Sequence, residues 1–309
     1  MDYSSTLTQI EFIKILIIIV IMSLIFNPLQ LNLTDFSILN AKPIYFNYNS
    51  VRIYLVGCGG TGSFLAPLLC RIANFLVEMR KRVHITFVDF DSVEAKNLWR
   101  QNFCSGELGF NKAQALAMRY KTIFPQLNIT AIEQTVDQLI LNGVIPTIVI
   151  GCVDNTNARQ QIEKLLIDHV SLISHGQTYA PCWWLDCGNA YTHGQVAIGN
   201  WYSIEIEDYQ LETATCLRLP LPSIQYPQLL IQSEEDEDVS CAEQVILNGQ
   251  SLNINSQMAV IAAEMVHQLL NNQLKRMQIE IDLFRGSMKS TFINQENIDW
   301  IIERATINT

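Results

Sequence analysis

The run Arg52-Ile-Tyr-Leu-Val-Gly57 is rich in β-forming residues and leads directly into a cluster of glycines that ends at Gly62. An apolar-periodic segment from about Thr61 to Met79 predicts a helix, and a second apolar strand is expected over Val83–Val88. This order of strand, glycine turn, helix and strand is typical of a parallel sheet, because parallel strands need a long crossover connection. The pattern therefore places the chain in the α/β class.

The glycine cluster, Gly57-Cys-Gly59-Gly60-Thr-Gly62, fits the spacing G-x-G-x-x-G. Gly57 permits a tight turn, Gly59 lets a ligand approach the backbone, and Gly62 allows the helix to pack closely on the strand. The free N–H groups at the start of the helix then face an anionic or polar part of a nucleotide. We expect this loop, Gly60 included, to line a cofactor site; a glycine turn without a ligand is the alternative interpretation.

Strands and helices continue to alternate as far as residue 181. The pattern predicts helices over Asn111–Tyr120 and Asn155–Asp168, and strands over Leu127–Ile132, from Thr147 to the turn at Asp154, and over Ser171–Ser174. These strands are apolar along their length, as expected for a sheet that helices cover on both faces.

The alternation of predicted strands and helices ends beyond Pro181. Trp183–Cys187 and Gly194–Gly199 are expected to be strands separated by a turn at Gly188-Asn189, which favours antiparallel additions to the sheet. The predicted fold is α/β, a Rossmann-like, doubly wound and mostly parallel sheet with antiparallel C-terminal additions.

Five segments follow from these patterns. We expect a hydrophobic N-terminal segment (1–28), a connector (29–50), a nucleotide-binding Rossmann-like core (51–200), a crossover region with an acidic loop (201–255) and a C-terminal helix and tail (256–309). The crossover region holds consecutive carboxylates, Glu234–Asp238, which repel one another and favour an exposed segment. In the last segment, a helix over Ser256–Leu270 has one apolar face, formed by Met258, Ile261, Met265 and Leu269.

The N-terminal segment is strongly apolar from Ile10 to Phe26 and approaches the length of a membrane-spanning helix. A secretory signal does not fit, because the first nine residues carry Asp2 and no positive charge. Two interpretations remain open: residues 10–26 contact a membrane as an anchor, or they pack as a helix on the domain or on a second subunit. An over-long gene start would also explain the stretch.

Composition limits the classes of function. The 309 residues include 30 Asp and Glu and 20 Lys and Arg, a net charge of −10, which argues against nucleic-acid binding because a basic face would be needed to meet phosphates. Apolar residues make up 49% of the chain, enough for a sizeable core. The eight cysteines form no C-x-x-C pair, which predicts reduced thiols in a cytoplasmic protein.

Polar residues recur after the predicted strands. Asp89 ends the second strand, where a carboxylate accepts both hydroxyls of a ribose. Asn97-Leu-Trp-Arg100-Gln follows, and Lys112 begins a helix twelve residues after Arg100. Asp154-Asn155 closes the fourth strand, where a carboxylate is well placed to hold Mg²⁺.

The order of these residues favours adenylation over hydride transfer. Arg100 and Lys112 would converge on a phosphate tail, which hydride transfer does not require. An adenylating site does require such cations, because triphosphate charge must be neutralised while a carboxylate attacks the α-phosphorus. Taken singly, each cation is equally well explained by a surface ion pair.

The series GxGGxG, D-x-D-x-V, N-L-x-R-Q, Lys and D-N resembles the ThiF/MoeB superfamily, whose relatives include the ubiquitin-activating enzymes. More narrowly, W-L-D-C-G-N at Trp184–Asn189, G-Q-V at Gly194–Val196 and S-C-A-E at Ser240–Glu243 resemble ThiF-like proteins of the plasmid-associated PRTRC system. The resemblance covers roughly residues 51–270. It implies binding of ATP and Mg²⁺, adenylation of a partner protein's C-terminal carboxylate, and release of pyrophosphate.

The resemblance also implies roles for single residues: the ribose for Asp89, the metal for Asp154, and the phosphates for Asn97, Arg100 and Lys112, with Asn155 and the glycine loop completing the cofactor site.

Cys241 matches a cysteine that accepts the activated acyl group in some members of the superfamily. That role needs a thiolate near the adenylate, and an ordinary loop cysteine is the alternative. PRTRC gene sets also encode a small ubiquitin-like protein, which the resemblance implies as the substrate. It further implies a homodimer.

Three features depart from the family pattern. Residues 1–50 contain no arginine, whereas bacterial relatives supply one to the ATP phosphates from the partner subunit's N-terminal region. The family's two C-x-x-C zinc pairs are absent, which predicts no structural zinc. Lys96 stands where relatives often carry a small polar residue, and it either contacts a phosphate or faces solvent.

The leading hypothesis is ATP-dependent activation of a protein C-terminus, in which Arg100 and Lys112 stabilise the developing charge. A nucleotide-binding scaffold that holds a partner without turnover is the second hypothesis, and the missing N-terminal arginine favours it. An NAD-linked oxidoreductase is the third, and it depends on the glycine pattern alone.

Overall fold

The computed structural model describes residues 38–141, 143–174, 180–212, 214–231 and 253–307. The chain divides into a short unit, Met1–Asn40, and a large unit, Ala41–Thr309, and the fold described below is that of the large unit. The apolar segment 10–26, the acidic run Glu234–Asp238 and Cys241 lie outside the described residues.

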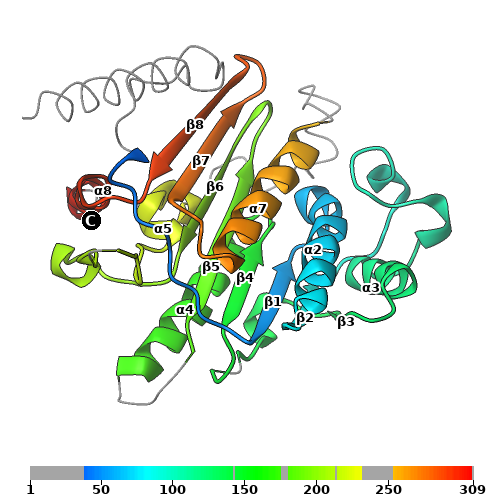
Figure 1. Ribbon diagram of the computed structural model, residues 1–309. Helices are drawn as coiled ribbons and strands as arrows, with labels where there is room; N and C mark the ends of the chain where they lie inside the picture. The colour runs from blue at the N-terminus through cyan, green and yellow to red at the C-terminus, as the bar shows by residue number, and fades with distance from the viewer. Residues whose placement is uncertain (1–37, 142, 175–179, 213, 232–252, 308–309) are drawn as a thin grey trace, which may run out of the picture. The chain divides into compact units, whose positions relative to one another are not determined.

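Eight strands form a sheet in the described part of the large unit, in the order β3-β2-β1-β4-β5-β6-β7-β8 (Figure 1). In that spatial order, the strands are β3 (Asn128–Ile132), β2 (Arg82–Val88), β1 (Ser50–Val56), β4 (Thr147–Gly151), β5 (Cys182–Asn189), β6 (His193–Gly199), β7 (Arg276–Asp282) and β8 (Ser287–Phe292). Strands β3 to β5 are parallel, and β6, β7 and β8 are antiparallel additions. The predicted fold class is confirmed.

Helices cover both faces of the sheet (Figure 1). One face carries α2 (Gly60–Glu78), α3 (Lys112–Ile123) and α7 (Ile254–Leu270), and the other carries α4 (Thr156–Ser174) and α5 (Pro222–Gln225), with α8 (Gln295–Ile307) packed on α5. Short 3-10 helices lie in the connections: η3 (Ala95–Asn97), η4 (Ser105–Glu107), η5 (Val136–Gln138), η6 (Ile206–Tyr209) and η7 (Pro227–Leu230).

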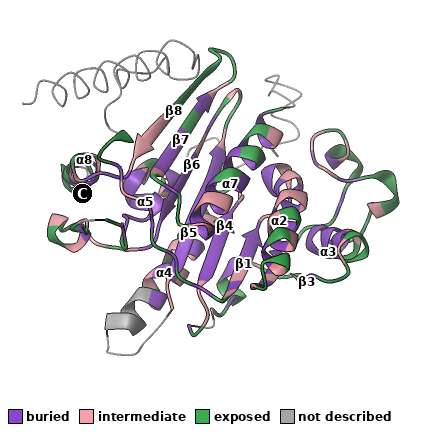
Figure 2. Cartoon of the chain, viewed as in Figure 1, coloured by how far each residue is buried: buried purple, intermediate pink, exposed green. Residues whose placement is uncertain are grey.

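The centre of the core is formed by β1, β4 and β5, which are buried almost throughout (Figure 2). Trp183 and Trp184, on opposite sides of β5, are both fully enclosed. These strands lack a polar alternation because helices exclude water from both of their faces. The predicted apolar face of α7 is buried as well, at Met258, Ile261, Met265 and Leu269.

Two predicted local features are wrong. Ser171–Ser174 is the last turn of α4 and not a strand. No glycine or proline lies between Asp168 and Ser174 to end the helix, and a segment of four residues is too short to separate the two periodicities. The turn predicted at Gly188-Asn189 lies instead beyond Asn189, because β5 pairs with β6 through both residues. A side chain at Gly188 would lie 2.5 Å from Gln195 Nε2 of β6, so this glycine serves packing between strands.

Residues 41–50 contribute to the core of the large unit. The Lys42 N–H donates to Ile293 O (2.8 Å), and the Ile44 N–H donates to Leu274 O (2.9 Å). Ile44 and Phe46 are fully buried. The chain therefore follows the C-terminal elements before it enters β1.

Among the described residues, α2 alone has the length and hydropathy of a membrane-spanning helix, and half of that stretch is buried inside the fold. A core helix of an α/β sheet has the same properties, and α2 packs on α7, β1 and β2.

Candidate functional site

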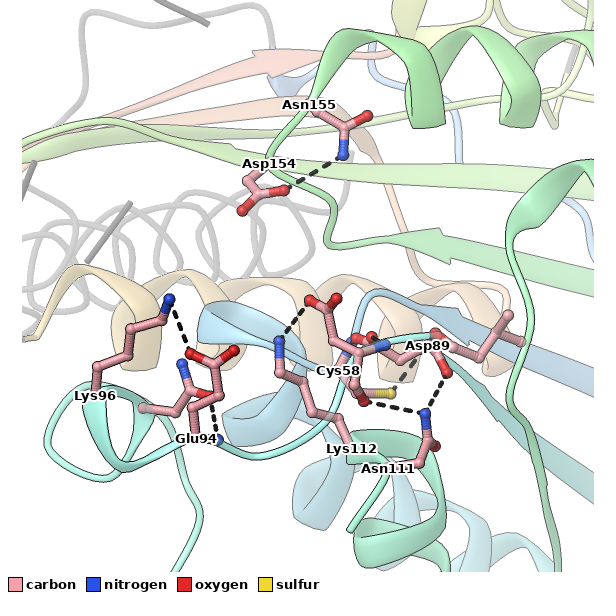
Figure 3. A network of polar contacts seen from close by, with 11 residues as sticks. Cys58, Asp89, Glu94, Lys96, Asn111, Lys112, Asp154 and Asn155 are labelled. Carbon is pink, nitrogen blue, oxygen red and sulfur yellow. Dashed lines mark hydrogen bonds and ion pairs between the residues drawn. The ribbon is translucent and has the colours of Figure 1, made fainter. Parts of the chain in front are cut away.

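The glycine turn lies where the carboxyl ends of the parallel strands meet. The strand order runs from β1 to β2 and β3 on one side and continues with β4 on the other, so it reverses at β1. In open α/β sheets, ligands bind in the crevice outside such a reversal. Gly57 follows β1, Asp89 follows β2 and Asp154 follows β4, so the topology brings these three predicted residues to one edge of the sheet. Figure 3 shows Asp89 and Asp154 at this edge.

Close packing explains two of the four glycines. Gly57 has a positive φ of 85°, and a side chain there would lie 2.6 Å from Cys152 O, at the turn after β4. A side chain at Gly62 would overlap Gly57 O. Gly62 therefore lets α2 approach β1, as predicted.

The other two glycines differ in what they face. A Cβ at Gly60 would lie 2.7 Å from Asn255 Oδ1 of α7, whereas the nearest atom to a Cβ at Gly59 would be a side-chain nitrogen at 3.5 Å. Asn255 Oδ1 accepts hydrogen bonds from Thr61 Oγ1 and Asn189 Nδ2, both at 3.2 Å. This network joins the starts of α2 and α7 to the end of β5, and it leaves Gly59 as the more open position of the turn.

Asp89 is fixed by the backbone around it. Its Oδ2 accepts the Cys58 N–H (2.6 Å), and its Oδ1 accepts the Asp91 N–H (2.8 Å). Burial raises the pKa of the Asp89 carboxyl, while Lys112 and the two N–H donors oppose that shift. Asn111, the N-cap of α3, donates to the carbonyl oxygens of Asp89 (2.8 Å) and Asp91 (3.0 Å). Each carboxylate oxygen of Asp89 keeps capacity to accept a further hydrogen bond, as a ribose site requires.

Two lysines at this edge of the sheet, Lys112 and Lys96, are each held by a carboxylate (Figure 3). Lys112 is buried, and its Nζ lies 2.7 Å from Asp91 Oδ2. Lys96 is half exposed, and its Nζ lies 2.8 Å from Glu94 Oε2. Asn97 is buried, and its Oδ1 accepts the Glu94 N–H at 2.8 Å, so in this structure it holds η3 in shape.

In the segment that follows η3, two polar atoms are buried without a hydrogen-bond partner in the described part of the chain: Arg100 Nε and Gln101 Oε1. The Gln101 amide is also the group nearest to Gly59. Buried polar atoms are nearly always paired in folded proteins. Arg100 Nε is a donor, so it fits a ligand acceptor such as a phosphate oxygen, whereas Gln101 Oε1 is an acceptor and fits a ligand donor.

Asp154 is exposed on the turn between β4 and α4. Asn155 caps α4, because its Oδ1 accepts the Ala158 N–H (2.8 Å), and its Nδ2 lies 3.4 Å from Asp154 Oδ1. Among the described residues, no group of three His, Cys, Asp or Glu side chains could hold a metal. A single exposed carboxylate suits Mg²⁺ that is held mainly by phosphates and water. The lack of structural zinc stays a prediction for the whole chain.

A buried ion pair supports the same turn. Arg159 Nε lies 3.3 Å from both oxygens of Asp186, a fully buried side chain of β5, and Arg159 Nη2 donates to Val153 O (2.8 Å). Burial raises the pKa of the Asp186 carboxyl, and Arg159 opposes that shift. Because Val153 precedes Asp154, this pair fixes the backbone that carries Asp154.

The cysteines divide between the described and undescribed parts of the chain. The described cysteines, Cys58, Cys70, Cys104, Cys152, Cys182, Cys187 and Cys216, are free thiols. Burial, and then the charge of Asp89, raises the pKa of the Cys58 thiol well above its ordinary value, which disfavours the thiolate form that a nucleophile requires. The role of Cys241 stays a prediction.

Sequence reasoning missed several residues that shape this edge: Asp91, Asn111, Arg159, Asp186 and Asn255. A local signal existed for Asn111, because Asn111-Lys-Ala-Gln114 is an N-cap pattern at the start of a helix. Asp186 and Asn255 are remote in sequence from the residues that they hold, so local patterns could not have identified them.

A glycine turn where the strand order reverses, with an acidic residue at the end of the next strand, is the arrangement by which doubly wound α/β domains bind nucleotides. A sequence model described as the ThiF family matches residues 41–297. The chain therefore belongs to the ThiF family.

Two curated relatives illustrate the family. The molybdopterin-synthase adenylyltransferase of Haemophilus influenzae is 30% identical over 116 residues, which are 37% of this chain and 44% of the relative. The NEDD8-activating enzyme E1 catalytic subunit of Saccharomyces cerevisiae is 38% identical over 91 residues, 28% of this chain and 27% of the relative. The matched regions thus span less than half of each relative.

Solved structures of similar fold include PaaA and Escherichia coli MccB. The PaaA crystal structure has a TM-score of 0.51 and 14% sequence identity, over 79% of this chain and 73% of PaaA. MccB, crystallised with AMPCPP and MccA, has a TM-score of 0.51 and 14% identity, over 79% of this chain and 64% of MccB. At this identity the likeness concerns the fold alone.

Proposed function

We propose that this protein uses ATP and Mg²⁺ to adenylate the C-terminal carboxylate of a small ubiquitin-like protein and releases pyrophosphate. The observation that carries the proposal is Arg100 Nε, a buried donor without a partner among the described residues. It belongs to the residue before Gln101, whose amide is the group nearest to the open Gly59 of the turn. Membership of the ThiF family supports the proposal, because relatives are named as an adenylyltransferase and as activating enzymes of ubiquitin-like proteins.

In the proposal, each residue at this edge contacts a different part of the nucleotide. Asp89 accepts the ribose hydroxyls, and the N–H groups at the start of α2 face the phosphates. Arg100 and Lys112 supply positive charge, and Gln101 supplies a neutral polar contact. Asp154 would hold Mg²⁺, directly or through water, and the ion would supply further neutralisation of phosphate charge.

The chemistry needs no nucleophile from this chain. An oxygen of the partner's carboxylate attacks the α-phosphorus, the bond from the α-phosphorus to the bridging oxygen breaks, and pyrophosphate leaves with that electron pair. The chain therefore contributes position and charge. Arg100 and Lys112 stabilise the negative charge that grows on the departing oxygens. This attraction is stronger at a partly buried site than between charges that are fully exposed to water.

Four further elements of the proposal concern the setting of the reaction. The narrower resemblance favours a PRTRC-type system as the source of the ubiquitin-like partner. Attack of the Cys241 thiolate on the carbonyl carbon of the adenylate would break the bond from that carbon to the phosphate oxygen, form a thioester and release AMP. We also propose a cytoplasmic homodimer, with membrane contact through residues 10–26 as the open alternative to a packed helix.

One observation favours a second candidate, a nucleotide-binding scaffold without turnover. Lys112 is paired with Asp91, which reduces the charge it offers to a phosphate. The NAD-linked alternative, by contrast, gains no support from membership of the ThiF family.

ATP–pyrophosphate exchange by the full chain tests the proposal. The probe is the small ubiquitin-like protein encoded with it, either intact or without its last two residues. We expect exchange only with the intact partner, and loss of exchange in Asp154→Ala. Asp168→Ala, an exposed aspartate in the later part of α4, is the matched control.

The result separates the two candidates. Exchange that depends on both the partner's C-terminus and Asp154 supports adenylation. Binding of ATP and partner without exchange contradicts it and favours the scaffold.

A further inference from the structure

Lys96 belongs to the same charged cluster as Lys112. It lies on η3, directly before Asn97 and four residues before Arg100. Figure 3 shows its ammonium group against Glu94, at the edge that also carries Lys112 and Asp154. The hydrogen bond from Lys96 lowers the pKa of the Glu94 carboxyl, and the charge of Lys112 lowers it further. Glu94 is therefore within electrostatic reach of both lysines.

The described residues at this edge carry no net positive charge. Among the described residues of this edge, the cations are Lys96, Arg100, Lys112 and Arg159, and the carboxylates are Asp89, Asp91, Glu94, Asp154 and Asp186. Four cations against five carboxylates give a formal charge of −1, and a triphosphate would add several negative charges. Each cation that can turn toward a phosphate therefore has a large effect on nucleotide affinity.

The two lysines differ in how firmly they are held. The Lys112 side chain is 9% exposed, so burial fixes its pair with Asp91. The Lys96 side chain is 50% exposed and that of Glu94 is 57% exposed. Ion pairs between exposed side chains contribute little, so Lys96 can leave Glu94 at small cost. The ammonium group of a lysine is a compact charge on a flexible four-carbon chain, so it can move to contact a phosphate.

We propose that Lys96 is a phosphate-binding residue of this site. Lys96 is paired with Glu94 before the nucleotide binds, and it turns to the β- and γ-phosphates when ATP binds. The inference rests on the proposed function. It adds a residue that determines specificity, because Lys96 would distinguish ATP from AMP, which has no phosphate beyond the α position.

Calorimetric titration of the full chain with ATP and with AMP tests the inference. Lys96→Met should weaken ATP binding about tenfold, the loss expected of one charged phosphate contact, and should change AMP binding less than about twofold. Lys96→Arg should restore most of the ATP affinity. Glu94→Gln should strengthen ATP binding about twofold, because the competing acceptor loses its charge.

Lys121→Met is the matched control, since Lys121 is an exposed lysine in the last turn of α3, nine residues and about 13 Å along the helix from Lys112. ATP affinity equal to that of the wild type in Lys96→Met overturns the inference. Equal losses for ATP and AMP overturn it too, because they indicate a structural role. A wild-type chain that binds no ATP refutes the proposed function itself, and is thereby distinguished from both results.

Discussion

Replacing Gly60 by alanine tests how the start of α2 is held in place. The added Cβ would lie 2.7 Å from Asn255 Oδ1 and 2.9 Å from Asn255 Cγ, closer than such atoms approach in folded proteins. Asn255 is buried, and its Oδ1 accepts hydrogen bonds from Thr61 and Asn189. It cannot move aside without weakening both bonds.

The two effects on the free energy of unfolding have opposite signs. Each lost hydrogen bond costs about 1 kcal/mol, so displacing Asn255 costs about 2 kcal/mol. Alanine in a helix is favoured over glycine by about 0.5–1 kcal/mol. The net expectation for Gly60→Ala is a loss of about 1–1.5 kcal/mol. In an Asn255→Ala background the collision is absent and both bonds are already lost, so the same substitution should gain about 0.5–1 kcal/mol.

Urea unfolding of the wild type, both single variants and the double variant measures this coupling. The expected result is a reversal of sign between the two backgrounds. A loss of the same size in both backgrounds would refute the reasoning, because the strain would then lie in the backbone of the turn and not in the contact with Asn255.

Three further predictions concern buried groups and close packing in the fold. Burial raises the pKa of the Glu163 carboxyl above its ordinary value of 4.5, so the contribution of the protonated carboxyl to stability is lost as the pH rises through the raised pKa. The urea midpoint of Glu163→Gln, relative to that of the wild type, should therefore increase above about pH 4.5. A decrease of this relative midpoint would contradict the prediction. Arg159→Met leaves the Asp186 carboxylate buried without its partner and should cost about 3 kcal/mol in urea unfolding, part of which Asp186→Asn recovers; wild-type stability would show that the pair is dispensable. Gly62→Ala overlaps a backbone oxygen and should yield little soluble protein, whereas Gly106→Ala meets nothing within 4 Å and should match the wild type in yield and urea midpoint.

Much of the fold could be predicted because its signals are local. The apolar strands before the glycine turn and before Asp154, and the apolar face of α7, are periodic patterns in which neighbours in sequence report burial. The two local errors occurred where such patterns are too short or ambiguous. The run at Ser171–Ser174 fits either periodicity, and Gly188 marks a close contact between strands and not a turn.

The candidate site was predicted in part. The order of residues indicated that Gly57, Asp89 and Asp154 follow the first, second and fourth strands, and the topology of the sheet brings their positions to one edge. The partners of the charged side chains could not be predicted in this way. The sequence offers several carboxylates to Lys112, and only the folded chain selects Asp91.

By itself, the sequence determined the class of fold, the position of the glycine turn and the residue types that gather around it, because these depend on periodicity and on spacing within one strand–helix–strand unit. The tertiary structure decided that Asn255 of α7 fills the space beside Gly60, and that Asp186 of β5 holds the turn that carries Asp154 through Arg159. These contacts join segments that are distant in sequence. Their geometry is set by how helices pack across the sheet, which no local pattern records.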